Sequence, residues 1–213
     1  MHLIHRGIIN KNFKENLLES FKKSFKKGYG VEADIHATKD NEFICFHDFT
    51  LKRIFNKNLS VKNLNYSKIN EISSRLGKPI PLLKDLLKSS GNKHAVFIEI
   101  KPIFSTFLLK KLLKETSRFT KCVFISFKHE NIYKLLNIKK NTKVGLSFCP
   151  PTSVKKIIEK LNKKRTNCLI LDKSYIKNKK IQDLNITKYY YTIRAKSEFN
   201  KFKRNNNLIF ENL

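Results

Sequence analysis

Short apolar runs alternate with longer amphipathic segments along the whole chain. The runs have the length and the aliphatic or aromatic content of strands, and they cover residues 3–6, 31–36, 42–47, 95–101, 122–127, 143–148, 167–172, 188–193 and 207–210. Most of the segments between them place apolar residues at helical spacing, and these segments cover residues 13–27, 81–90, 105–117, 129–139, 151–164 and 196–204. The pattern therefore predicts strands and helices in alternation.

The order of these elements predicts an α/β fold. Strand and helix alternate at intervals of about 20–30 residues, which is typical of βαβ units and a parallel sheet. Eight strands in this arrangement favour a closed (β/α)8 TIM barrel, with a doubly wound open sheet as the alternative. No internal repeat and no domain-sized linker interrupts the pattern, so residues 1–213 are expected to form a single barrel domain.

The second and third apolar runs break the alternation. Only a few residues separate 31–36 from 42–47, too few for a crossover helix, so the two runs are expected to pair as an antiparallel hairpin around residues 39–41. Residues 49–94 then hold a small polar insertion and the helix 81–90 that follows it. The barrel is thus expected to carry a hairpin and an insertion after its second strand.

The charge of the chain points to an anionic partner. Lys and Arg number 45 against 17 Asp and Glu, for a formal net charge of +28. A basic nucleic-acid-binding protein is one reading. However, the excess is mostly Lys, whereas Arg is the residue suited to bidentate recognition of phosphate and guanine. We therefore interpret most of the charge as a solvated surface, and we expect no specific nucleic acid.

The remaining composition favours a soluble cytoplasmic protein. Cys45, Cys122, Cys149 and Cys168 show no CxxC spacing, which is typical of free thiols in a reducing compartment. The first residues contain no apolar signal-peptide core, and no apolar run approaches the length of a membrane span. We expect no membrane span, and the pattern carries no signal for an oligomeric state.

Carboxylates interrupt two of the apolar strands. Alternation places Glu32 and Asp34 on one face of the second strand, and Glu99 and Lys101 share a face in the run 95–101. Ionised carboxylates inside a barrel are costly unless they are paired or bind a cation. Two readings follow: a site for Mg²⁺ or Ca²⁺, which prefer oxygen ligands, or buried ion pairs such as Glu99–Lys101 and Asp34–Arg6.

The predicted topology brings further polar residues to the same end of the barrel. The first strand ends in His5 and Arg6, and the hairpin carries His47 back beside Asp34. The active sites of TIM barrels gather at the carboxyl ends of the strands. Two histidines, an arginine and a lysine beside three carboxylates therefore predict an active site at this mouth.

These residues occur as short motifs in a fixed order. The motifs are His5-Arg6-Gly7, Glu15-Asn16, Glu32-Ala33-Asp34-Ile35, Thr38-Lys39-Asp40, His47-Asp48, Ile80-Pro81-Leu82-Leu83 and Ile98-Glu99-Ile100-Lys101. The ordered set resembles the glycerophosphodiester phosphodiesterase family over essentially the whole chain. There are departures: Lys14 and Leu17 replace the family's usual Pro and Thr, and Tyr191 replaces a Trp. The last strand lacks the usual Thr-Asp-x-Pro ending, so the final helix is expected to be missing or very short.

The resemblance implies an enzyme of lipid and glycerol metabolism. The implied reaction is metal-dependent hydrolysis of a small-molecule glycerophosphodiester to sn-glycerol 3-phosphate and an alcohol. The implied roles are metal ligands Glu32, Asp34 and Glu99 for Mg²⁺ or Ca²⁺, phosphate-binding residues Arg6 and Lys101, and general acid and base His5 and His47, in an order left open. Tyr191 is a candidate for the pocket wall. A barrel that binds phosphodiesters without cleaving them is a further alternative.

Overall fold

The strands close into a ring. The computed structural model describes residues 1–9 and 14–211. Within this part of the chain eight parallel strands follow one another in the order β1–β9–β8–β7–β6–β5–β4–β2, and β2 pairs back to β1. The strands are β1 (Leu3–His5), β2 (Gly30–Ala37), β3 (Phe43–Cys45), β4 (Val96–Ile100), β5 (Cys122–Ser126), β6 (Val144–Phe148), β7 (Cys168–Asp172), β8 (Thr187–Ile193) and β9 (Asn207–Phe210). Because β1 pairs with both β9 and β2, the fold is the predicted TIM barrel and not an open sheet.

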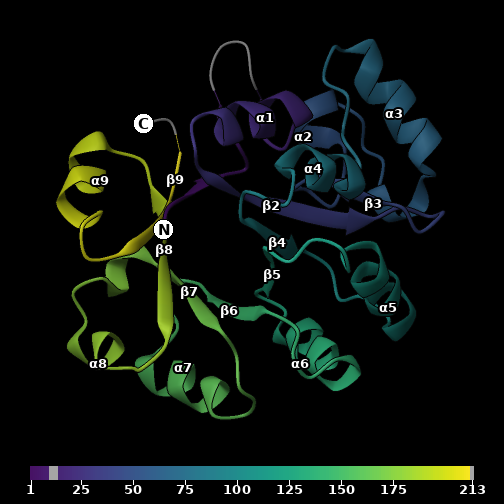
Figure 1. Cartoon of the computed structure of the whole chain (residues 1–213). Helices are drawn as coiled ribbons and strands as arrows, with labels where there is room; N and C mark the ends of the chain where they lie inside the picture. The colour runs from purple at the N-terminus through teal and green to yellow at the C-terminus, as the bar shows by residue number, and fades with distance from the viewer. Residues whose placement is uncertain (10–13, 212–213) are drawn as a thin grey trace.

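Helices surround the ring on its outside (Figure 1). They are α1 (Leu18–Lys26), α4 (Leu83–Ser90), α5 (Thr106–Glu115), α6 (His129–Ile138), α7 (Val154–Leu161), α8 (Lys179–Gln182) and α9 (Lys196–Phe202). All except the short α8 were predicted from the apolar periodicity. Helix α7 begins later than expected. The hydroxyl of Ser153 accepts a hydrogen bond from the Lys156 amide and caps α7, so this helix starts at Val154 rather than at residue 151.

Helix α1 begins without a side-chain cap. Its N-cap residue is Leu17, which cannot accept a hydrogen bond from the first turn. The start expected at Phe13 lies outside the described residues, as does the region after Glu211 where the last helix was in question.

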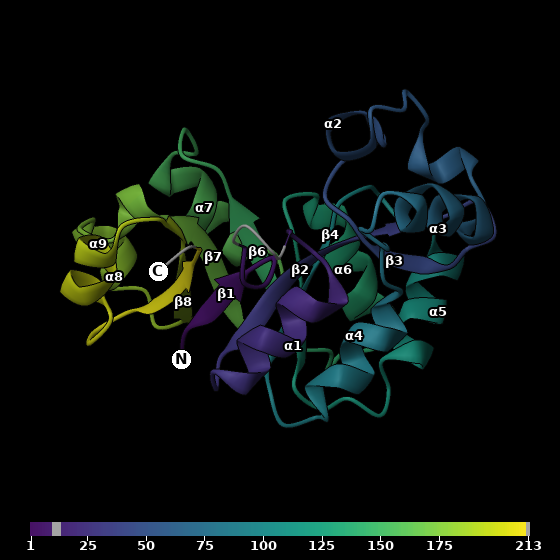
Figure 2. The same ribbon diagram turned by 90° about the horizontal axis from the view of Figure 1, so that it is seen from above.

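The hairpin and the insertion form a unit at one edge of the barrel. Strand β3 pairs antiparallel with β2, as predicted. Residues 49–80, expected only as a polar insertion, also contain α2 (Lys52–Phe55), a 3₁₀ turn (Val61–Asn63) and α3 (Tyr66–Arg75). They enclose a small apolar cluster that includes Leu51, Val61 and Ile69. Helices α2 and α3 lie with β3 on the side of the molecule away from α8 and α9 (Figures 1 and 2).

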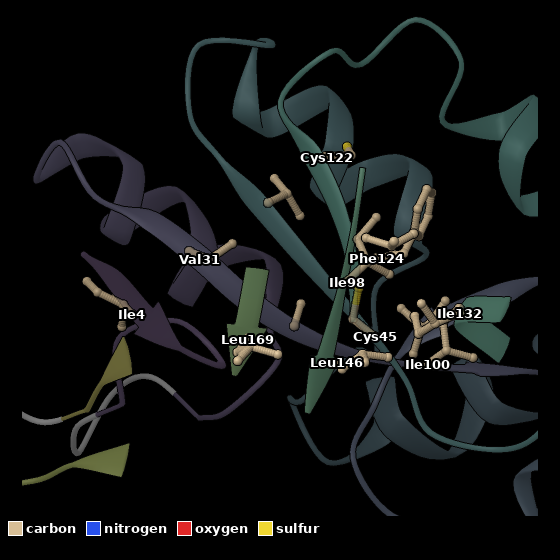
Figure 3. Close-up of a cluster of buried hydrophobic side chains, with 14 of the residues drawn as sticks. Ile4, Val31, Cys45, Ile98, Ile100, Cys122, Phe124, Ile132, Leu146 and Leu169 are labelled. Atoms are coloured by element: carbon tan, nitrogen blue, oxygen red, sulfur yellow. The ribbon is translucent and has the colours of Figure 1, made fainter. Parts of the chain in front are cut away.

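Two apolar layers follow from the strand alternation. The larger layer joins outward-facing strand residues such as Ile98, Phe124 and Leu146 to the helices (Figure 3). The smaller layer fills the barrel interior and comes from strands alone: Leu3, Phe97, Ile125, Cys168, Ile170, Tyr189 and Ile209. Parallel strands bury both faces, which explains why they read as continuous apolar runs.

Neither a disulfide nor a membrane-spanning helix occurs in the described part of the chain. All four cysteines are free, and Cys149 alone among them is exposed. No helix in the described part of the chain is both long and apolar enough to cross a bilayer.

Candidate active site

The barrel interior changes from apolar to polar toward the carboxyl ends of the strands. On β1 and β4 the inward side chain two positions after an interior apolar residue is polar: Leu3 is followed by His5, and Phe97 by Glu99. The register aligns His5 with Glu32 and Asp34 with Glu99. The topology thus gathers the predicted polar residues into one layer at the mouth.

Three carboxylates converge in this layer. One oxygen from each of Glu32, Asp34 and Glu99 lies within 4.8 Å of the others. The residues are 2%, 1% and 8% exposed, respectively. Such a group of hard oxygen ligands suits Mg²⁺ or Ca²⁺.

The predicted ion pairs are also present, and they account for two of the three carboxylates. Arg6 Nε lies 3.0 Å from Asp34 Oδ2, and Lys101 Nζ lies 2.7 Å from Glu99 Oε1 and 3.4 Å from Asp34 Oδ1. Among the described residues, neither carboxylate oxygen of Glu32 has a hydrogen-bond partner, although both are buried. Three anionic groups thus face two cationic ones. The ion-pair reading leaves Glu32 uncompensated, and a divalent cation fits this deficit.

The pKa shifts follow from the same imbalance. Burial, with the neighbouring Asp34 and Glu99 carboxylates, raises the pKa of Glu32 well above its ordinary value. Burial and Asp34 likewise raise the pKa of Glu99. Burial also opposes ionisation of Asp34, but Arg6 and Lys101 outweigh it and hold the pKa of this carboxyl at about 2. The site therefore contains one firmly ionised carboxylate and two that ionise at a cost.

The turn after β1 aims Arg6 into the mouth. Arg6 has φ +56° and Gly7 has φ +76°, so the chain turns sharply through the left-handed region. A Cβ on Gly7 would lie 2.9 Å from the backbone carbon of Ser20, which leaves no room for a side chain. The turn thus explains the glycine of the His-Arg-Gly motif, because Gly7 passes close to α1 where no side chain fits.

His5 lies between two carboxylates. Its Nδ1 lies 2.9 Å from Glu211 Oε2, and its Nε2 lies 3.8 Å from Glu32 Oε2. Glu211 also pairs with Arg194. The hydrogen bond from His5 lowers the pKa of Glu211 to about 2, so this carboxyl is ionised.

His47 is held in a similar way on the opposite side. Its Nδ1 lies 2.6 Å from Asp48 Oδ1, and Asp48 Oδ2 accepts a hydrogen bond from Arg53 Nε at 2.6 Å. Its backbone oxygen lies 3.1 Å from Nε2 of His36, which is thereby engaged outside the carboxylate layer. Burial lowers the pKa of His47. The neutral imidazole is thus favoured, with Nε2 as its free nitrogen.

A cavity of about 240 Å³ connects these groups. Of the predicted site residues, it is lined by His5, Arg6, Glu32, His47, Glu99, Lys101 and Tyr191. Asp34 lies beneath the lining and contacts Arg6 and Lys101. The hydroxyl of Tyr191 donates to the carbonyl of Phe148 at 2.8 Å, which fixes the ring in the wall. The structure therefore brings all eight predicted residues to one place.

Three further residues support the site and were not assigned from the sequence. Asn16 donates from Nδ2 to Asp34 Oδ2 at 3.0 Å, and Glu15 contacts both Arg6 and Arg53. These two belong to the Glu-Asn pair that was interpreted only as part of a helix start. The third is Glu211, whose spacing from the interior residue Ile209 was the available signal.

The comparisons with known proteins agree with this geometry. The model of the Glycerophosphoryl diester phosphodiesterase family matches residues 5–207. The chain belongs to this family. The matched range contains both site histidines and all three carboxylates.

Curated relatives of the family match over part of their length. A glycerophosphodiester phosphodiesterase of Caldanaerobacter subterraneus subsp. tengcongensis is 28% identical over 68% of this chain and 65% of its own. The human lysophospholipase D GDPD1 is 30% identical over 56% of this chain and 42% of its own. The aligned part of the chain thus spans less than two thirds of either relative.

Solved structures of the family share the fold. A glycerophosphodiester phosphodiesterase of Thermotoga maritima superposes with a TM-score of 0.81 at 23% identity, covering 98% of this chain and 92% of that one. A phosphodiesterase of Oleispira antarctica, solved with the product sn-glycerol-3-phosphate, gives 0.85 at 16% identity, covering 99% and 92%. Both show the same barrel.

Proposed function

We propose that this protein hydrolyses glycerophosphodiesters to sn-glycerol 3-phosphate and an alcohol. The observation that carries the proposal is the convergence on one cavity of two histidines with three carboxylates, Arg6 and Lys101. Phosphodiesters are anionic and resist attack, so a site must neutralise the phosphate and move protons at both the attacking and the leaving oxygen. This set of side chains supplies each of these functions.

Glu32, Asp34 and Glu99 are the proposed ligands of a divalent cation, Mg²⁺ or Ca²⁺. The two buried, unpartnered oxygens of Glu32 support this assignment. When bound, the cation supplies positive charge to the non-bridging phosphate oxygens. Arg6 and Lys101 lie beside the carboxylates and add their own charge at the cavity wall, where hydrogen bonds to phosphate are strong.

His5 and His47 are the proposed general acid and base. Each has a carboxylate on Nδ1, so Nε2 is the nitrogen left to exchange a proton with the substrate. One, as a neutral imidazole, accepts a proton at Nε2 from the attacking hydroxyl, and the other, as an imidazolium with protons on both nitrogens, donates its Nε2 proton to the departing alkoxide. We propose that the glycerol 2-hydroxyl attacks first and expels the alcohol, which gives a cyclic phosphate that water then opens. Tyr191 forms part of the wall against which the substrate lies.

Two other functions are less well supported. Nucleic-acid binding would not explain why three carboxylates are buried together at the mouth of the barrel. The family assignment does not favour this function either. A barrel that only binds phosphodiesters would not need two histidines oriented by carboxylates.

The proposal is tested by glycerol 3-phosphate release from glycerophosphocholine and glycerophosphoethanolamine. Activity should be lost after EDTA treatment and restored by Mg²⁺ or Ca²⁺. Activity that persists in the chelator would contradict the metal site. An inactive protein that binds DNA or RNA with strong salt dependence would favour the nucleic-acid alternative instead.

A further inference from the structure

His5 is tied to the other end of the chain. Its Nδ1 lies 2.9 Å from Oε2 of Glu211, 206 residues away. The contact exists because β9 pairs with β1 and closes the barrel, with Leu3 opposite Ile209. Two residues further along each strand, the side chains of His5 and Glu211 enter the mouth together.

Glu211 is itself held from two directions. Its backbone amide donates to the carbonyl of Ile193 at 3.0 Å, which extends the pairing of β9 with β8 beyond the last strand residue. Its Oε1 accepts a hydrogen bond from Arg194. Glu211 is thus a fixed acceptor rather than a mobile surface carboxylate.

A fixed carboxylate on Nδ1 determines the tautomer of the imidazole. A carboxylate only accepts hydrogen bonds, so a neutral His5 must carry its proton on Nδ1. Nε2 is then the unprotonated nitrogen, and it faces the cavity on the side of Glu32. Without Glu211 the ring could carry the proton on either nitrogen and rotate about its side-chain bonds.

We propose that Glu211, anchored by Arg194, is a positioning residue that fixes the orientation and tautomer of His5. The inference rests on the proposed function, because it assigns Glu211 a part in the same reaction. The arrangement of His47, Asp48 and Arg53 supports it independently. In both cases an arginine holds a carboxylate, the carboxylate holds Nδ1, and Nε2 remains for the substrate.

The test uses Glu211→Gln in the 213-residue chain, with Glu159→Gln as the matched control. Glutamine keeps the volume of the side chain but presents both a donor and an acceptor, so it no longer imposes one tautomer. Glu159 is an exposed glutamate of α7, and it is not among the residues that line the cavity. Two quantities are measured: steady-state glycerol 3-phosphate release, and the ¹⁵N chemical shifts of the His5 ring, assigned by their absence in His5→Ala.

The wild type and the control should show His5 protonated on Nδ1. Glu211→Gln should show a mixture of tautomers and a loss of about 10–100-fold in kcat, with little change in KM. If Glu211→Gln had the kcat of the wild type, the inference would be overturned, whichever tautomer of His5 the variant shows.

A folding defect in the variant leaves the inference testable. In that case the wild-type protein decides alone, because a His5 ring protonated on Nε2 and not on Nδ1 would overturn the proposed orientation. An inactive wild type whose His5 carries the Nδ1 proton would instead count against the proposed function and leave the orienting contact standing.

Discussion

Oε2 of Glu32 lies 3.8 Å from Nε2 of His5, across the pairing of β2 with β1. The carboxylate that has no hydrogen-bond partner in the described structure therefore stands beside a proposed proton-transfer group. A cation held by Glu32 would lie close to the oxygen that gains or loses this proton. Metal binding and proton transfer are thus expected to depend on the same small region.

The first prediction concerns the stability of the metal-free protein. Glu32 has a raised pKa, so its ionisation opposes folding, and the wild type should lose stability as pH rises above the ordinary glutamate value near 4.5. Glu32→Gln removes this charge. At pH 8 in EDTA the variant should unfold with a free energy about 1–3 kcal/mol higher than the wild type, measured by urea denaturation.

Added Mg²⁺ or Ca²⁺ should reverse this order. The wild type gains stability in proportion to the logarithm of metal concentration, whereas Glu32→Gln gains much less. Glu159→Gln, on the exposed side of α7, serves as the control and should follow the wild type throughout. If the unfolding free energy of the wild type does not change when either metal is added, the carboxylate cluster is ruled out as their site.

The second prediction concerns the two histidines. His5→Ala and His47→Ala should each lower kcat by roughly 10²–10⁴-fold, because each removes one proton-transferring group. The far-ultraviolet circular dichroism should not change, since both side chains lie at the mouth and not in the apolar layers.

His94→Ala is the matched control for both variants. Its imidazole stacks on Phe25 with 5.0 Å between ring centroids, away from the cavity. It should turn over like the wild type. Full activity in either mouth variant would disprove the acid–base assignment.

The sequence predicted the barrel well because its strands are buried on both faces. Runs such as 122–127 and 167–172 are continuous and apolar, and they match β5 and β7 to within a residue. The rare acids in such runs, Glu32 and Glu99, stood out for the same reason. Burial made both the fold and the proposed metal ligands visible.

The unpredicted parts depend on contacts distant in sequence. Helix α3 is polar overall, and one of its two buried residues is Ser73, so its sequence was interpreted as part of a polar insertion. The support of Asp34 by Asn16 requires a turn that no periodicity reveals. Glu211 meets His5 only once the ring has closed, and period-two alternation alone cannot identify that partner.

The third prediction concerns the turn that aims Arg6. Gly7 and Gly28 both have positive φ, near +76° and +79°, but only Gly7 lacks room for a Cβ. Gly28→Ala should cost about 1–2 kcal/mol of unfolding free energy, the usual penalty for a left-handed alanine. Gly7→Ala should cost about 1–3 kcal/mol more, because the new methyl group meets Ser20.

Urea denaturation of the two glycine variants measures this difference. Gly7→Ala should also raise KM, since displacement of the turn moves Arg6 away from the phosphate position. If the two substitutions destabilise the protein equally, the backbone near Ser20 can move to make room for the new methyl group. The short distance between Gly7 and Ser20 would then not constrain the turn.

The fourth prediction concerns the pH dependence of the contact between Glu211 and His5. The folded protein lowers the pKa of Glu211 to about 2 from an ordinary value of 4.5. The carboxylate therefore stabilises the fold above pH 4.5, and this contribution is lost as pH falls toward 2. At pH 7 Glu211→Gln should unfold with a free energy about 1–3 kcal/mol below the wild type, as expected for hydrogen bonds to a charged group.

The difference between the two proteins should change little between pH 7 and about 5 and should shrink as the pH is lowered from there toward 3, because the unfolded wild type then binds a proton at Glu211 while the folded protein does not. Chemical denaturation at several pH values measures it, and Glu159→Gln should track the wild type at each one. A difference that stays constant over this range would mean that Glu211 contributes packing alone, since packing does not titrate. A difference that grows toward acid would mean that the folded state holds this carboxyl protonated, contrary to its contacts with His5 and Arg194.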